Sequence, residues 1–304
     1  MSAPIGGQAV LEGVMMRGPS AWSVAVRKPD GEIAEVNRPI SSFLLKHRWA
    51  RLPVVRGVFA LGESLAIGFR ALAISANYAA QEEGEDGEVQ TELSRGQLIF
   101  AFGIAIGFAL LLFKVSPALL TNWLPIESTT WFVVVEGLIR VTVFILYLVI
   151  VGFMPDLRRV FQYHAAEHKA INAYEAGDPL EPEVVQRHSL IHVRCGTAFL
   201  LYVMVIAIFV FAFVGQPGWV WLIVSRILLL PVIAGIAYEV IRFAGKHPTN
   251  PILRTILAPG LWLQRLTTRA PSLDQIEVSI RALHEVLRLE GRLTPEERKV
   301  EVMA

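Results

Sequence analysis

The chain has 304 residues, of which 54% are hydrophobic and only 18% are charged, and its mean hydropathy is +0.49. An average soluble chain is about 45–50% apolar and about 25% charged, so this composition indicates a membrane protein. The net charge of +1 argues against nucleic-acid binding. The single cysteine, Cys195, excludes an intrachain disulfide and a four-cysteine metal centre.

The first 53 residues are expected to be rich in β-strands. Two alternating stretches, 23–28 and 32–36, flank Pro29-Asp30-Gly31, and this pattern predicts a β-hairpin. Several glycines that precede the hairpin indicate tight backbone turns, although they match no phosphate-binding glycine pattern. They are Gly6, Gly7, Gly13 and Gly18.

Four stretches are apolar and long enough to approach or meet the length of about 20 helical residues that a bilayer core requires. These predicted spans are residues 98–113, 131–153, 197–214 and 219–243. Lys and Arg are frequent before the first span, between the second and third, and after the fourth. The link between the first two spans contains only Lys114, and the last link contains none. This distribution predicts that both termini and the central loop are cytoplasmic.

Two further apolar segments are ambiguous. In residues 54–76 the charges Arg56, Glu63 and Arg70 recur every seven residues and share one helix face, which favours an interfacial or core-packed amphipathic helix over a fifth span. Residues 252–266 are too short to span and are interrupted by Pro259-Gly260, which predicts a re-entrant or surface-lying hairpin.

The predicted fold is a polytopic α-helical membrane protein with four transmembrane helices and a small α+β cytoplasmic domain built from the N- and C-terminal segments. Ser272 and Gln275 form a capping-box pattern at the start of an amphipathic helix, which we expect to pack on the N-terminal sheet. The predicted parts are a β-rich segment 1–53, an amphipathic helix 54–80, an acidic linker 81–96, a first span pair 97–153, a cytoplasmic loop 154–196, a second span pair 197–243 and a C-terminal segment 244–304.

The central loop contains the clearest chemical pattern. A helix is predicted from about Asp156 to Glu175, and it places His164 and His168 one turn apart on its apolar face. Imidazoles at this spacing can bind one divalent cation. Glu167 borders the same face, as a ligand or as the general base that activates a metal-bound water. This is the H-x-x-E-H string of the inverzincins; two packed histidines that hydrogen-bond to backbone are the alternative.

Further ligands are available on the same side of the membrane. Glu239 lies about one turn inside the fourth span, where a carboxylate is costly and indicates a functional site, unless it pairs with Arg242. His192 is a better candidate ligand than His188 because it is nearer the membrane. Cys195 is either a thiolate ligand or a small packed residue. Two more residues, Glu175 and Arg194, are expected to support the ligands or the local structure.

A second polar cluster is expected in the outer half of the membrane. Glu136 and Arg140 are four residues apart on the second span, and Arg226 lies at a similar depth on the fourth. These groups either pair with one another or leave a surplus arginine that holds an anionic lipid headgroup.

Several stretches of the sequence together resemble the bacterial YqhQ-type membrane proteins, a family described as predicted metal-dependent enzymes. The resemblance runs through most of the chain, with Val193 standing where a proline is expected. It rests on residues 6–18, 163–169, 192–197, 231–239 and 259–268. It implies a metal enzyme and identifies no substrate.

The sequence therefore predicts a membrane-embedded metal-dependent hydrolase. His164 and His168 bind a divalent metal ion, for which zinc is a candidate, and Glu239 and His192 complete the ligands. Glu167 is the general base, and the substrate is a membrane lipid, a lipid-linked molecule or a membrane-protein segment. The alternative is a non-catalytic scaffold or assembly factor that binds a protein partner and has a structural metal. A transporter is disfavoured by four spans without an internal repeat.

Overall fold

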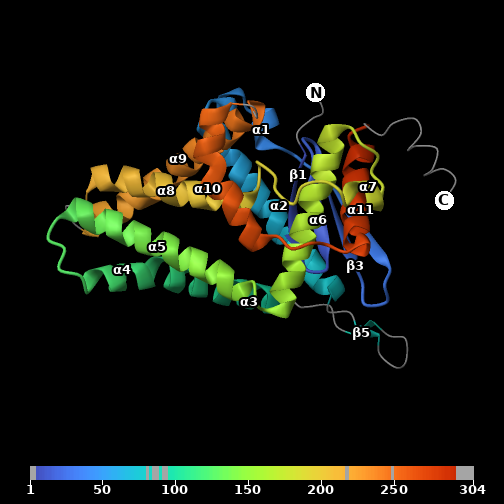
Figure 1. The fold of residues 1–304 in the computed structure, drawn as a ribbon, viewed down its shortest axis with the longest axis horizontal. Helices are drawn as coiled ribbons and strands as arrows, with labels where there is room; N and C mark the ends of the chain where they lie inside the picture. Colours follow the sequence, from blue (N-terminus) through green and yellow to red (C-terminus); the bar gives the residue numbers. More distant parts are fainter. Residues whose placement is uncertain are drawn as a thin grey trace.

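The computed structural model describes residues 5–79, 82–83, 89–90, 95–215, 219–247 and 250–291. Figure 1 shows a long helical bundle and, at one end of it, a small sheet covered by helices. Within the predicted acidic linker, two residue pairs form short paired strands, β5 (Glu82–Glu83) and β6 (Val89–Gln90), and most of its remaining residues lie outside the described ranges.

The sheet has four antiparallel strands in chain order. They are β1 (Gly6–Val10), β2 (Gly13–Arg17), β3 (Ala21–Arg27) and β4 (Ile33–Pro39). The predicted hairpin is confirmed as β3–β4. Of the turns predicted from the early glycines, the one at Gly18 is confirmed, since its N–H donates 2.8 Å to the carbonyl of Ala21 between β2 and β3. The other three are wrong, because Gly6, Gly7 and Gly13 lie within strands. At Gly13 the backbone of β3 approaches so closely that a Cβ would collide with the carbonyl oxygen of Ala25.

Helices cover both faces of the sheet. On one face, α11 (Leu273–Leu289) and α6 (Pro155–Ala176) bury Val14 and Met16. As predicted, α11 packs on the sheet and begins with a capping box of Ser272 and Gln275. On the other face, the second half of α2 (Val55–Ala79) packs against the sheet. Short helical turns complete this region: α1 (Phe43–Lys46), η1 (Arg48–Arg51) and α7 (Pro182–Val185).

The bundle contains the most apolar helices. One continuous helical run comprises α3 (Arg95–Leu110), the π-helical segment η2 (Leu111–Val115) and α4 (Ser116–Asn122). The others are α5 (Thr129–Val151), α8 (Gly196–Val214) and α9 (Trp219–Lys246). Because the first helical run continues to Asn122, Lys114 lies inside it and not in the link that the sequence predicted.

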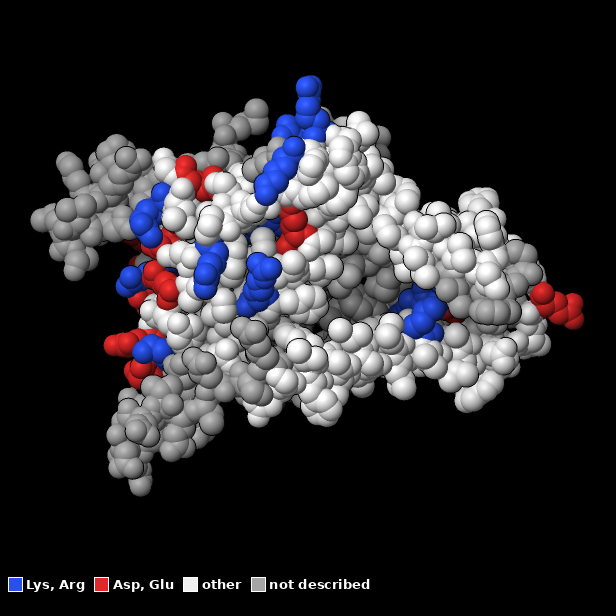
Figure 2. Space-filling view, turned by 180° about the vertical axis from the view of Figure 1, so that it is seen from behind, with Lys and Arg blue, Asp and Glu red and all other residues white. Residues whose placement is uncertain are grey.

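Five helices in the described part of the chain are long and apolar enough to cross a membrane. Their ranges are Val55–Ala79, Ile99–Asn122, Thr129–Val151, Gly196–Val214 and Val224–Lys246. The predicted count of four spans is therefore not confirmed, since α2 also meets the criterion. Charged side chains gather over the sheet end, whereas the bundle is nearly uncharged (Figure 2). These helices indicate a multi-pass membrane protein.

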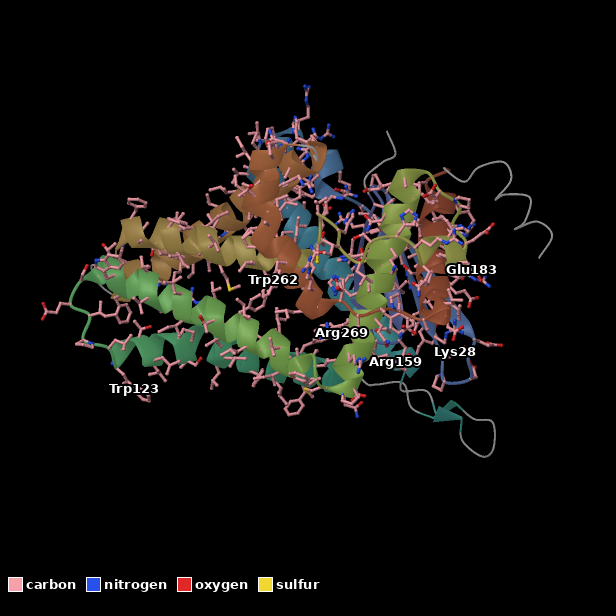
Figure 3. The ribbon with its side chains drawn as sticks, in the orientation of Figure 1. Lys28, Trp123, Arg159, Glu183, Trp262 and Arg269 are labelled. Atoms are coloured by element: carbon pink, nitrogen blue, oxygen red, sulfur yellow. The ribbon has the colours of Figure 1, made fainter. Side chains whose placement is uncertain are left out.

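The hairpin predicted at Pro259-Gly260 is also wrong, because α10 (Pro251–Thr267) is one continuous helix. α10 contacts α8 and α5 near the end of the bundle that faces the sheet (Figure 1). Gly260 allows a close approach: a Cβ there would collide with the hydroxyl of Tyr202, which donates a hydrogen bond of 2.7 Å to the carbonyl of Leu257. In the side-chain view, Trp123 lies at the far end of the bundle from Lys28 and Glu183 (Figure 3).

Candidate metal centre

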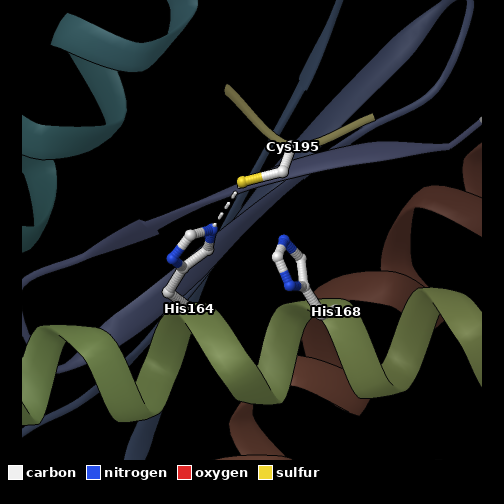
Figure 4. A group of neighbouring side chains, drawn as sticks. All are labelled: His164, His168 and Cys195. Carbon is white, nitrogen blue, oxygen red and sulfur yellow. Dashed lines mark hydrogen bonds between the residues drawn. The ribbon is translucent and has the colours of Figure 1, made fainter. Parts of the chain in front are cut away.

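The predicted histidine helix is α6. Pro155 occupies its first turn, where a missing N–H costs nothing, and Gly177 ends it with a φ of +79°, a conformation that favours glycine. His164 and His168 lie on the same side of this helix, with ring centroids 4.4 Å apart. Both rings face Cys195 (Figure 4).

Cys195 is the N-cap residue of α8 and is only 4% exposed. Its Sγ lies 3.3 Å from Nε2 of His164. One nitrogen from each histidine and the sulfur of Cys195 all lie within 4.8 Å of one another. Among the described residues, this is the group of metal-binding side chains whose donor atoms converge on one point.

The other nitrogen of each ring is held by a backbone carbonyl. Nδ1 of His164 lies 2.8 Å from the carbonyl oxygen of Thr267, and Nδ1 of His168 lies 2.6 Å from that of Leu190. In a neutral imidazole, an Nδ1–H that donates to a carbonyl leaves Nε2 unprotonated and oriented as a ligand, as in most histidine metal sites. The structure therefore presents two Nε2 atoms and one sulfur to a common centre.

Glu167 is buried beside this group. Its Oε2 lies 3.6 Å from Nε2 of His168, and its side chain is 6% exposed. Strand β1 passes directly over the carboxylate, and a Cβ on Gly7 would lie 2.6 Å from Cγ of Glu167. The absence of a side chain at Gly7 therefore makes the space in which Glu167 reaches the histidines.

Burial disfavours the charged forms of His164 and Cys195, but the attraction between them is stronger. Burial lowers the pKa of His164, yet the neighbouring Cys195 raises it to about 9 overall. Burial also opposes ionisation of Cys195, and the two histidines nevertheless hold its pKa well below the usual range. The N-terminus of α8 adds a favourable dipole for a thiolate. Cys195 is thus prepared for the form that binds metals.

The donor set fits a divalent metal ion. One thiolate and two imidazoles match the ligand types that tetrahedral zinc sites use and leave a fourth position beside the carboxylate of Glu167. The outer hydrogen bonds from Nδ1 of both histidines match the usual support of such sites as well. Cys195, which the sequence left open between ligand and packing, is the third donor of this group.

The structure does not bring Glu239 to the histidines. Its two carboxylate oxygens pair with Arg56 of α2, with 2.6 Å between Oε1 and Nε of Arg56, and Oε1 also accepts from the backbone N–H of Val54 at 3.4 Å. Glu239 therefore takes part in the packing of α2 on α9. The sequence alternative had named Arg242 as its partner, and the structure gives Arg56 instead.

His192 lies next to the group without joining it. Its ring centroid is 5.9 Å from that of His168, and its Nε2 is 3.3 Å from the carboxylate of Glu175. Glu175 also pairs with Arg194. Partial burial raises the pKa of Glu175, but the contacts with His192 and Arg194 lower it to about 2. Glu175 thus holds the segment that leads to Cys195.

Other polar side chains hold the same segment, and the sequence did not single them out. Gln264 of α10 accepts from the backbone N–H of His192 at 2.9 Å and donates to its carbonyl at 2.8 Å. Lys169 and Asn172 of α6 donate to carbonyls between Gln186 and Ile191. A polar residue on the buried face of an amphipathic helix was the available signal for Gln264.

The predicted polar cluster in the bundle is brought together. Glu136 pairs with Arg140, and its second oxygen lies 4.0 Å from Arg226. Lys114 joins them, with Nζ 3.6 Å from Glu136.

These features define a class: a multi-pass helical membrane protein with a buried Cys-His-His group where a covered β-sheet meets the bundle. A family model described as "Protein of unknown function (DUF1385)" matches residues 52–289. The chain is 35% identical over 296 residues to "Uncharacterized protein YqhQ" of Bacillus subtilis (strain 168), covering 94% of this chain and 93% of that protein. The chain belongs to this family, as the resemblance predicted. No solved structure matches it.

Proposed function

We propose that this protein is a membrane metalloenzyme of the hydrolase type, with His164, His168 and Cys195 as metal ligands. The observation that carries the proposal is the convergence of three ligand atoms within 4.8 Å, with the buried carboxylate of Glu167 beside them. Glu239 and His192, predicted as ligands, are replaced in this proposal by Cys195.

Each residue has a distinct role. A divalent ion at this site would polarise a substrate carbonyl or phosphoryl group and lower the pKa of a bound water. Glu167 accepts the proton of the attacking water and returns it to the leaving group. The Nδ1 bonds to Thr267 and Leu190 keep both imidazoles in one orientation. The absence of a side chain at Gly7 lets the carboxylate of Glu167 lie beside the histidines.

The position of the site favours a substrate drawn from the membrane. Cys195 immediately precedes the apolar helix α8, and the carbonyl that supports His164 ends α10. Exposed apolar side chains line the neighbouring part of α10, including Ile256 and Trp262. A lipid, a lipid-linked molecule or a membrane-protein segment is the substrate class that such a location would admit.

We also propose that the site opens on the cytoplasmic side. With Lys114 inside a helix, residues 123–128 between the first two bundle helices contain no Lys or Arg. Because the second half of α2 packs on the sheet, we count only the four bundle helices as spans, which puts both termini on the side of the sheet. Basic residues are concentrated at that end, which the positive-inside rule assigns to the cytoplasm of a cell membrane.

Metal analysis of purified protein tests the proposal. We expect about one equivalent of a divalent ion in the wild type and a loss of that ion in His164→Ala/His168→Ala. His188→Ala is a matched control, because His188 contacts Asp178 at 3.1 Å and lies outside the group. Equal, substoichiometric metal in all three proteins would refute the proposal.

One observation favours the second candidate, a scaffold or assembly factor for a protein partner with a structural metal. Cys195 and His168 are almost fully buried, and structural zinc sites are closed whereas catalytic ones keep an open position. Cobalt substitution separates the two. In an enzyme, a small added anion can occupy the open position and change the visible spectrum of the cobalt protein. In the same case, Glu167→Gln keeps the metal but alters the pH dependence of that spectrum. In a structural site, neither treatment changes the spectrum.

A further inference from the structure

The polar cluster in the bundle has an excess of positive charge. Three cationic side chains, Lys114, Arg140 and Arg226, surround the single carboxylate of Glu136. In the described part of the chain, each of the three cations forms its ion pair with that carboxylate. The formal balance is +3 against −1, within helices that are otherwise apolar. Unbalanced charge in such a medium is costly, so the cluster is incomplete without an anion.

The cations retain unused donors. Nε of Arg140 is buried and makes no hydrogen bond within the described structure. The guanidinium of Arg226 lies 4.0 Å from Glu136, beyond a hydrogen bond, and stacks 4.8 Å from the ring centroid of Phe211. Buried N–H groups are rarely left unpaired in folded proteins. Several donors are therefore available to a second partner.

Local backbone structure brings the third cation into the cluster. Lys114 lies in the π-helical segment η2, where the hydroxyl of Ser116 donates 2.7 Å to the carbonyl of Leu112. A π-helical turn widens a helix and is often found at functional sites. The side chain of Lys114 is 43% exposed, whereas those of Arg140 and Arg226 are 16% and 13% exposed. The cluster is thus open on the side of Lys114, and Figure 2 shows a group of basic side chains at the surface of the otherwise nearly uncharged half.

The depth of the cluster matches lipid more closely than bulk water. At about 1.5 Å per residue, Glu136, Arg226 and Lys114 each lie roughly 10–12 Å from the helix ends that point away from the sheet. Long Lys and Arg side chains extend toward the interface from such positions. A phosphate oxygen is the anion that several converging cations recognise best.

We propose that Lys114, Arg140 and Arg226 form a binding site for a phosphate group, separate from the Cys-His-His group. A phosphomonoester, which carries close to two negative charges at neutral pH, would neutralise the surplus charge, and a phosphodiester would halve it. The phosphate belongs to a membrane lipid or is a free anion, and the experiment below distinguishes these sources.

The test uses the full chain in phosphatidylcholine nanodiscs. Thermal unfolding is measured without additive, with phosphatidic acid or phosphatidylglycerol in the bilayer, and with inorganic phosphate in solution. We expect phosphatidic acid to raise the unfolding temperature most. A response to inorganic phosphate alone would identify the source as a free anion. No response to any of the three would overturn the proposal.

Four variants test the residues. Lys114→Gln/Arg226→Gln should require about tenfold more phosphatidic acid for the same rise in unfolding temperature, given the strength of charge-assisted hydrogen bonds. Lys114→Gln alone, at the most exposed position, serves if the double variant does not fold. Glu136→Gln removes the competing carboxylate and should keep or strengthen the response, and Lys246→Gln at the other end of α9 controls for charge alone. An unchanged response in the cation variants, or an equal loss in Glu136→Gln, would show that the cluster is only an internal ion-pair network.

Discussion

Glu175→Gln tests whether the segment before Cys195 is held by charge. Glu175 contacts both His192 and Arg194, and its pKa falls from its ordinary value of 4.5 to about 2. That difference corresponds to about 3 kcal/mol. The side chain is 31% exposed, so solvent screening reduces the contribution to about 1–2 kcal/mol. In a protein of this size we expect the unfolding temperature at pH 7 to fall by roughly 2–6 °C.

The stability difference between wild type and Glu175→Gln should depend on pH in a defined direction. A carboxyl group with a lowered folded-state pKa stabilises the protein above its unfolded value, and this contribution is lost as the pH falls through the folded value. The difference between wild type and Glu175→Gln should therefore be full above about pH 4.5 and disappear toward pH 2. Thermal unfolding in mild detergent across this range measures it, with Glu183→Gln, an exposed carboxylate on α7, as control. A difference that is equal at pH 7 and pH 3, or absent at pH 7, would refute the reasoning.

Two further substitutions test the packing around the candidate metal centre. Gly7→Ala places a Cβ 2.6 Å from Cγ of Glu167 and should displace that carboxylate, which lowers activity or alters the cobalt spectrum. The control is Gly6→Ala, whose Cβ meets no atom within 4 Å and which should leave both unchanged. Equal effects of the two substitutions would contradict the role of Gly7. Gln264→Leu leaves the buried N–H and carbonyl of His192 unpaired, at about 1–3 kcal/mol each. The free energy of unfolding should therefore fall by about 2–6 kcal/mol, and a fall below about 1 kcal/mol would contradict the role of Gln264 in holding His192.

The sequence was sufficient where the signal was local. The spacing of His164 and His168 on one helix face, the turn at Pro29-Asp30-Gly31 and the capping box at Ser272 all depend on residues close in the chain. Each of these predictions is confirmed. Local hydrogen bonding and helical periodicity determine such features, so no knowledge of the tertiary packing is needed.

The partners of Glu239 and Cys195 depended on contacts between distant segments. Glu239 was predicted as a ligand because a carboxylate in a span needs a partner, but that partner is Arg56, 183 positions away on α2. Cys195 lies 31 positions from His164, and only the crossing of α6 with the start of α8 brings them together. No periodicity in the sequence states which helices pack against each other.

Glycine and proline were misread for a related reason. Their residue types predicted turns at Gly7 and Gly13 and a break at Pro259-Gly260, because both residues often interrupt regular structure. In the fold, these glycines allow close approach: β1 to Glu167, β2 to β3, and α10 to α8. Whether a glycine serves a turn or a close contact depends on its neighbours in space.

The most direct test of the proposed metal centre is X-ray absorption at the edge of the bound metal, measured on the purified wild type and on Cys195→Ser. We predict a wild-type spectrum with one sulfur ligand, at about 2.3 Å if the metal is zinc, together with imidazole nitrogens. Cys195→Ser should lose the sulfur signal and bind the metal at least about tenfold more weakly. Full metal content and an unchanged spectrum in Cys195→Ser, or a wild type that binds no metal, would contradict a centre formed by Cys195, His164 and His168.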